Sequence, residues 1–63
     1  MPIVFIDIME GRPSEKIDQL IENVTDTISK TLDAPKENVR VIVRENPKTH
    51  WGIGGISAQN LGR

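Results

Sequence analysis

Residues 3–9 read Ile-Val-Phe-Ile-Asp-Ile-Met, and this stretch decides the fold because it predicts a buried strand at the start of the chain. Only Asp7 interrupts an apolar run rich in β-branched residues, which is typical of a strand covered on both faces, as in a parallel sheet. Residues 10–14, Glu-Gly-Arg-Pro-Ser, then supply a turn and a helix start.

A helix is predicted over residues 14–32, where the apolar residues recur at spacings of three and four. Its apolar stripe consists of Ile17, Leu20, Ile21, Val24, Ile28 and Leu32. Pro35 prevents the helix from continuing. At the start, either Ser14 caps the helix or Pro13 takes the first helical position.

A second strand is predicted over residues 39–45, Val-Arg-Val-Ile-Val-Arg-Glu, which alternate between two faces. A strand, a long helix and a strand in this order predict a β-α-β unit with parallel strands and a right-handed crossover. The glycine-rich residues 50–55, His-Trp-Gly-Ile-Gly-Gly, predict a short hairpin or an irregular arm. The fold class is therefore α/β, with residues 1–63 as a single domain.

Association with copies of itself is expected because the chain is short. A domain of this size buries only about 60% of the surface that its unfolded chain exposes, and it usually needs disulfides, a metal or partner subunits. The chain has no cysteine and one histidine, which excludes disulfides and leaves no metal site without help from carboxylates. One helix covers only one face of the sheet, so the bare face, which carries Ile42, predicts a closed oligomer built from dimers.

Charge and hydropathy narrow the range of partners. The chain has 8 Lys and Arg against 9 Asp and Glu, a net charge of −1, which argues against nucleic-acid binding. No apolar run approaches the roughly 18–20 residues that span a bilayer, and no basic segment of a signal peptide follows Met1. We therefore expect a cytoplasmic protein with no membrane partner.

Pro2 is the sharpest chemical feature, because removal of Met1 leaves it with a free secondary amine. An apolar wall and nearby cations disfavour the charged form of an amine, and the resulting lower pKa suits a general base near neutral pH. Alternatively, Pro2 merely starts an edge strand, where it has no N–H to lose.

Two arginines are candidates for anion binding. Arg12 follows a glycine after the first strand, and Arg40 lies in a β-branched segment where a guanidinium must find an anion or reach solvent. Either could bind a carboxylate through its fork of donors. Arg12 could instead be a solvated turn residue, and Arg40 could form an intersubunit ion pair with Glu10 or Asp7. Arg44 is expected to be structural.

The segment around the only tryptophan offers weaker candidates. Trp51 either walls a pocket or fills an oligomer interface. His50 is expected to be structural or to face solvent, because no nucleophile or paired acid accompanies it. Residues 52–55 are not a phosphate loop, since they lack the long spacing and the Lys-Ser/Thr pair of one.

Five short segments together resemble a known family. They are residues 1–4 (Met-Pro-Ile-Val), 9–12 (Met-Glu-Gly-Arg), 32–35 (Leu-Asp-Ala-Pro), 39–42 (Val-Arg-Val-Ile) and 50–55 (His-Trp-Gly-Ile-Gly-Gly). They extend over the whole chain, whose length is also that of a family subunit, and in this set the chain resembles the 4-oxalocrotonate tautomerase family.

The resemblance implies an assembly and a site. Subunits of that family pair, and three pairs form a hexamer, so a homohexamer is expected here. Pro2 would be the catalytic base. Arg12 would bind a distal substrate carboxylate, while Arg40 of a neighbouring subunit would bind the other carboxylate end and polarise the 2-oxo oxygen. Typical members have phenylalanine or tyrosine where Trp51 stands, which leaves substrate size open. The walls that keep water from the base would be Met9, Trp51 and Ile53.

The implied reaction is that of an isomerase, a keto–enol tautomerase without cofactor or metal. Its substrates would be monocarboxylate or dicarboxylate dienols such as 2-hydroxymuconate, within the catabolism of aromatic compounds. Two alternatives stay open. One is a family member with dehalogenase or decarboxylase activity, although residues 53–57 contain no acid that could activate water for dehalogenation. The other is a non-enzymatic oligomeric binding or scaffold protein with the same fold.

Overall fold

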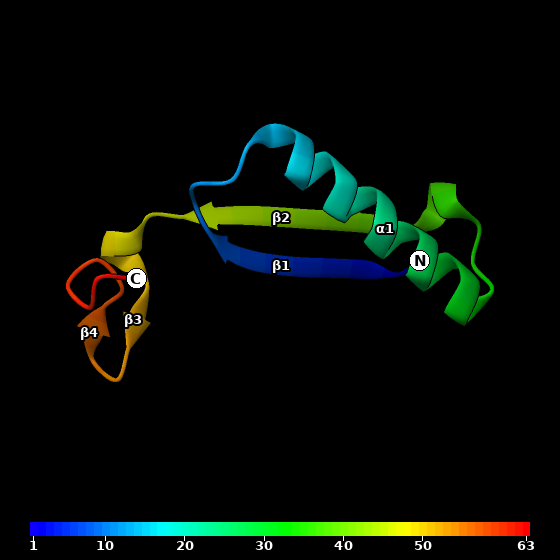
Figure 1. Cartoon of the computed structure of the whole chain (residues 1–63). Helices are drawn as coiled ribbons and strands as arrows, with labels where there is room; N and C mark the ends of the chain where they lie inside the picture. Colours follow the sequence, from blue (N-terminus) through cyan, green and yellow to red (C-terminus); the bar gives the residue numbers. More distant parts are fainter.

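The computed structural model describes residues 1–63 as a β-α-β unit followed by a small hairpin (Figure 1). The elements are β1 (Ile3–Met9), α1 (Ser14–Leu32), η1 (Lys36–Asn38), β2 (Arg40–Asn46), η2 (Lys48–His50), β3 (Gly52–Ile53) and β4 (Ile56–Ser57). The predicted α/β class, with two parallel strands, one long helix and a C-terminal hairpin, is confirmed.

The sheet of the β-α-β unit pairs β1 with β2 in parallel, from Ile3 opposite Arg40 to Met9 opposite Asn46. The second strand begins one residue later than predicted, because the N–H of Val39 donates to the carbonyl of Lys36 (3.0 Å) and closes the η1 turn. It also ends one residue later, at Asn46, whose carbonyl accepts a hydrogen bond from the N–H of Glu10 (2.9 Å).

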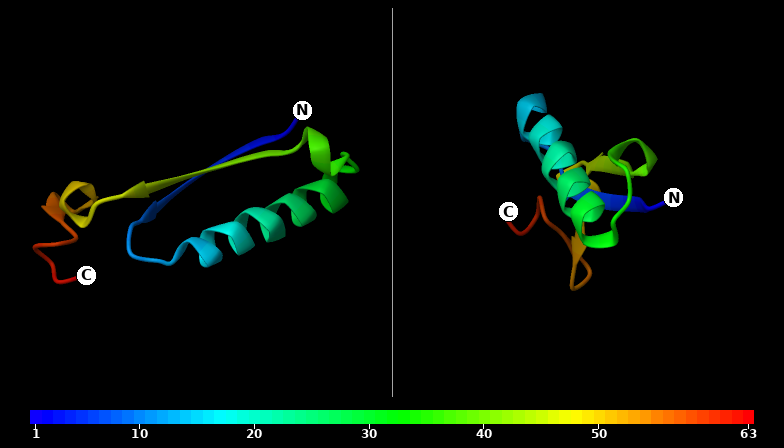
Figure 2. Two further views of the ribbon diagram at one scale, coloured as in Figure 1. Left: turned by 90° about the horizontal axis from the view of Figure 1, so that it is seen from above. Right: turned by 90° about the vertical axis from the view of Figure 1, so that its right-hand side faces the viewer.

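Helix α1 lies along one face of this sheet and has the predicted bounds (Figure 2). Neither expected arrangement of its start is found. Pro13 is extended (φ −68°, ψ 154°), so it precedes the first helical residue instead of occupying that position, and no side chain caps the helix. At the other end, Asp33 adopts the left-handed conformation (φ 53°) and its N–H donates to the carbonyl of Ser29. No helix of the chain combines the length and the apolarity needed to cross a membrane.

The chain has almost no core of its own. Only Val39 (7% exposed) and Ala58 (0%) are buried. Alternate residues of β1 and β2 on the helix side are half-buried. On the opposite face, Ile3 (54%), Phe5 (60%) and Ile42 (43%) are exposed. The prediction that one face of the sheet is left bare within a single chain is therefore confirmed.

The residues after β2 form an arm that projects beyond the end of the sheet (Figures 1 and 2). β3 and β4 are antiparallel, with Ile53 opposite Ile56. Gly54 (φ 60°) and Gly55 (φ 89°) form the two-residue turn between them, and positive φ at both positions is what a type I′ hairpin turn requires. The arm folds on itself through Ala58, whose N–H donates to the carbonyl of Trp51 (2.7 Å).

Candidate active site

Pro2 lies at the amino end of β1, beside the start of β2. Its carbonyl accepts a hydrogen bond from the N–H of Arg40 (3.0 Å), so the sheet ladder itself holds these two backbones together. Pro2 is half-buried, whereas Met1 is 76% exposed. The peptide bond between Met1 and Pro2 therefore follows a residue that extends into solvent.

The guanidinium of Arg40 is held at its own end of the sheet. Its Nη1 donates to the carbonyls of Glu37 (2.6 Å) and Val39 (3.5 Å). Arg40 is opposite Ile3 in the strand register, and its side chain is therefore on the face away from α1, because successive strand residues alternate between faces. Pro2 directly precedes Ile3, so by the same alternation Pro2 and the side chain of Arg40 are on opposite faces of the sheet.

Arg12 and Met9 lie together at the opposite end of β1. Gly11 has φ 127°, a conformation open to glycine, and it turns the chain out of the strand. Arg12 follows, and its Nη1 donates to the carbonyl of Met9 (3.1 Å). At about 3.3 Å per strand residue, Pro2 and Met9 are about 23 Å apart.

Trp51 and Ile53 lie on the arm, beyond the same end of the sheet as Arg12 (Figure 1). Both are half-buried within the arm. The six predicted site residues thus form two groups in one chain. Pro2 and Arg40 are at the amino end of the strands, and the other four are at or beyond the carboxyl end. A single chain encloses no pocket that joins them.

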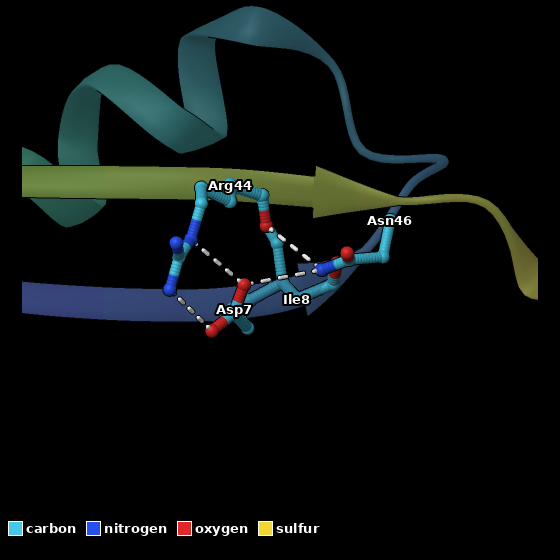
Figure 3. Close-up of polar contacts among 4 residues, drawn as sticks. All are labelled: Asp7, Ile8, Arg44 and Asn46. Carbon is cyan, nitrogen blue, oxygen red and sulfur yellow. Dashed lines mark hydrogen bonds and ion pairs between the residues drawn. The ribbon is translucent and has the colours of Figure 1, made fainter. Parts of the chain in front are cut away.

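Arg12 and Arg40 differ from Arg44 in having no carboxylate partner within the chain. Arg44 forms a two-pronged ion pair with Asp7, Nε to Oδ1 and Nη2 to Oδ2, both at 3.1 Å (Figure 3). These bonds, with a weaker one from Asn46, hold the pKa of Asp7 below its usual range. The charge of Arg44 is therefore neutralised locally, as expected of a structural residue. Arg12 and Arg40 keep guanidiniums that can still take an external anion.

The network around Asp7 was missed in the sequence. Asn46 joins it by donating from Nδ2 to Oδ1 of Asp7 (3.4 Å) and to the carbonyls of Ile8 (3.2 Å) and Arg44 (3.3 Å) (Figure 3). Asp7 is one of the two carboxylates expected to pair with Arg40 of a neighbouring subunit. Within the chain, Asp7 pairs with Arg44 instead, because the strand register places these two residues directly opposite one another. A count from the predicted strand starts, Ile3 and Val39, would have placed Asp7 opposite Val43, so the pair depends on the start of β2 at Arg40.

His50 is exposed, with Thr49 Oγ1 3.5 Å from its Nδ1. It lies at the opposite end of the sheet from Pro2, and its ring is bonded to no acid, only to the hydroxyl of its neighbour Thr49. This placement agrees with the expectation that it faces solvent.

The arrangement of elements and of residues can be compared with known proteins. The family model described as "Tautomerase enzyme" matches residues 2–60. The chain belongs to the tautomerase family. The expected class of enzyme, an isomerase that interconverts keto and enol forms, is thereby confirmed.

Relatives of this tautomerase match it over their full length. A 2-hydroxymuconate tautomerase of Stutzerimonas stutzeri is 54% identical, and one of Pseudomonas putida is 51% identical, each over 100% of both chains. The fold is equally close to solved structures. A structure from work on 4-oxalocrotonate tautomerase isozymes of Methylibium petroleiphilum has a TM-score of 0.93 and 48% identity, and covers 98% of this chain and 100% of that one. A heterohexamer 4-oxalocrotonate tautomerase of Chloroflexus aurantiacus J-10-fl has a TM-score of 0.91 and 36% identity, over 97% and 98% of the two chains.

Proposed function

We propose that this tautomerase converts 2-hydroxy-dienoates such as 2-hydroxymuconate to 2-oxo-alkenoates, with Pro2 as the general base after removal of Met1. Full-length similarity to proteins named 2-hydroxymuconate tautomerase supports this assignment most directly. We place the activity in the cytoplasm, in the catabolism of aromatic compounds.

The chemistry of Pro2 depends on its nitrogen. With Met1 attached, the nitrogen belongs to an amide whose lone pair is delocalised into the carbonyl, and it cannot accept a proton near neutral pH. As a free secondary amine it takes the proton of the substrate 2-hydroxyl and returns it to a carbon further along the conjugated chain. Partial burial and nearby guanidiniums disfavour the protonated amine, which keeps the base ready.

Two guanidiniums position the substrate and stabilise its charge. Arg40 stabilises the negative charge that develops on the dienolate oxygen and the adjacent carboxylate. Arg12 holds the far carboxylate and draws electron density toward that end. The absence of a carboxylate partner for either guanidinium within the chain supports both roles. Because each chain holds its Arg40 guanidinium at its own η1 turn, we assign the Arg40 at a given Pro2 to a neighbouring copy.

The site is completed between copies. Pro2 is about 23 Å from Met9 along the strand, and the guanidinium of Arg12 is bonded to the Met9 carbonyl, so Pro2 and Arg12 of one chain are too far apart to hold one small substrate together. Another copy must therefore bring its Arg12 to Pro2. The Met9, Trp51 and Ile53 that lie at or beyond the same end of the sheet come with it and exclude water from the base. A hexamer of three dimers satisfies this requirement and covers the bare sheet face.

Two preparations of the same chain test the role of Pro2, one verified by mass spectrometry to lack Met1 and one verified to keep it. The Met-free form is expected to isomerise 2-hydroxymuconate, and the Met-retaining form to be nearly inactive with unchanged fold and assembly. Equal rates would remove Pro2 from the mechanism. Absence of activity in both forms, with assembly intact, would favour a binding or scaffold protein.

A further inference from the structure

The bare face of the β1–β2 sheet is not uniformly apolar. Ile3, Phe5 and Ile42 occupy it toward the amino ends of the strands. Asp7 and Arg44 occupy it toward the carboxyl ends, directly opposite one another in the register (Figure 3). An apolar patch and an ion pair thus share one surface that no part of the chain covers.

The ion pair is geometrically complete without help from outside. Both carboxylate oxygens of Asp7 accept hydrogen bonds from Arg44 at 3.1 Å, and Asn46 adds a third donor at 3.4 Å. The guanidinium carbon of Arg44 also lies 5.6 Å from the centroid of the Phe5 ring, within cation–π range. The pair is therefore joined to the apolar patch through Phe5, while its side chains are still about half exposed (59% for Arg44 and 47% for Asp7).

The contribution of such an ion pair to stability differs between a solvent-exposed surface and a buried interface. In water an exposed ion pair contributes little to stability, because solvent screens both charges. Once another protein covers it, either charge alone carries a large desolvation penalty, whereas the two together, fully hydrogen-bonded, form a neutral group that can be buried. Loss of one partner should therefore weaken a protein–protein contact that buries the pair, but should have little effect on a surface that stays in solvent.

We propose that Asp7 and Arg44 together form part of the surface by which copies of this chain associate. In that interface each side chain neutralises the other, which lowers the desolvation penalty of burying the two charges. This rests on the assembly proposed above. A second copy fits this face because its apolar patch needs cover that one chain does not provide, since only two residues of the chain are buried. The charges of Asp7 and Arg44 sum to zero, so this part of the face offers no net attraction to an acidic or a basic partner. The one unpaired charge on the face is Arg40 at its amino end, which belongs to the proposed site.

A double-mutant cycle tests this inference by sedimentation equilibrium at neutral pH. Asp7→Asn leaves an unpaired guanidinium on the face, and Arg44→Gln leaves an unpaired carboxylate. Each single variant is expected to raise the dissociation constant of the assembly by roughly a hundredfold or more. The double variant carries neither charge and is expected to assemble within about tenfold of the unmodified chain. If a single variant also unfolds, the inference still requires the double variant to recover both the fold and the assembly.

The second ion pair of the chain provides a matched control. Lys36 Nζ lies 2.7 Å from Oδ1 of Asp26, with exposures of 65% and 35%, and joins η1 to α1 on the other side of the sheet. Asp26→Asn and Lys36→Gln are expected to leave the dissociation constant unchanged. Single variants at Asp7 and Arg44 that assemble as well as these controls would overturn the inference while leaving the assembly in place. A monomeric unmodified chain would overturn both.

Discussion

Under the proposed function, the two ends of the β1–β2 sheet carry different groups of one active site. At the amino end, a backbone hydrogen bond joins Pro2 to Arg40, and the candidate base lies at the surface next to Met1. At the carboxyl end, Arg12 is bonded to Met9, and the arm extends further with Trp51. Each end has a guanidinium without a carboxylate partner. Neither end combines the candidate base with the apolar residues expected to exclude water from it.

This separation explains why so small a chain can be an enzyme. A chain of 63 residues with two buried side chains cannot enclose a substrate. It can, however, place a base at one end of a rigid strand and an anion-binding group at the other, and obtain the pocket by joining unlike ends of different copies. Under this proposal, assembly and catalysis depend on the same contacts.

The amino end is expected to show the largest mutational effect. Arg40→Ala removes a charge-assisted contact whose target charge grows in the transition state, so kcat should fall with a loss of about 1.5–3 kcal/mol. Steady-state kinetics on 2-hydroxymuconate with the Met-free variant give this value. An unchanged kcat would place Arg40 outside the site.

The carboxyl end is expected to act mainly through binding. Arg12→Ala should weaken handling of dicarboxylate dienols by a similar or smaller amount, about 1.5–3 kcal/mol at most. A monocarboxylate dienol has no distal carboxylate to lose, so its kinetics should change much less. Comparing kcat/KM for the two substrate types measures the difference. Equal losses on both would show that Arg12 does not bind the distal group.

Mixed assemblies test whether the two ends of a site come from different chains. Arg12 and Arg40 of one chain cannot serve the same substrate if the sheet holds them about 20 Å apart. In oligomers formed by co-expression of Arg12→Ala and Arg40→Ala chains, random mixing should leave about a quarter of the sites with both guanidiniums. Activity should therefore rise well above that of either variant alone.

The control for this experiment is the same two proteins combined without subunit exchange, with native mass spectrometry to verify which oligomers are mixed. Mixed oligomers that stay at the level of the single variants would mean that one chain supplies both arginines to a site.

The sequence predicted the elements well because their signals are local. The change of period at residue 14 and Pro35 predict the bounds of the helix, and alternation predicts the second strand. The errors are local too. The start of β2 depends on one hydrogen bond of Val39, and the helix start depends on the extended ψ of Pro13. The roles of the site residues were expected from a resemblance. The predicted strand over residues 3–9 places Pro2 and Arg12 at opposite ends, but no pattern within one chain indicates how the two ends would be brought together, because the proposed meeting is a contact between chains.

The chain has one ion pair near each end of the sheet, and the two pairs should differ in how their contributions to stability depend on pH. The pKa of Asp7 is lowered by hydrogen bonds from Arg44 and then Asn46, and that of Asp26 by Lys36. Both contributions are therefore present above the usual carboxyl pKa, near pH 4, and are lost as pH falls through the lower folded-state values. The pKa of Lys36 is raised by Asp26, so its contribution is present below about pH 10.4 and is lost as pH rises through the higher folded-state value.

Alkali should therefore weaken only the Asp26–Lys36 pair, because arginine stays charged at that pH. Urea unfolding at fixed protein concentration across both pH windows measures this. Lys36→Gln should flatten the alkaline slope and Arg44→Gln should flatten part of the acid slope. An alkaline slope that survives Lys36→Gln would have to come from another group.

The smallest expected effect compares the two ends of α1, which lie at opposite ends of the sheet. At its C-terminus, Asp33 has φ 53°, a conformation that favours glycine, and a negative charge at this position is unfavourable next to the negative end of the helix dipole. Asp33→Gly should raise the free energy of unfolding by about 1 kcal/mol, and Asp33→Asn, which removes only the charge, by about 0.5 kcal/mol. At the N-terminus, Pro13→Ser supplies the missing cap but gives up the rigid ring in the unfolded chain, so the two changes should nearly cancel, within about 0.5 kcal/mol. Urea midpoints at equal protein concentration give all three values. A destabilising Asp33→Gly would mean that the Asp33 side chain makes a contact in the assembly that one chain does not contain.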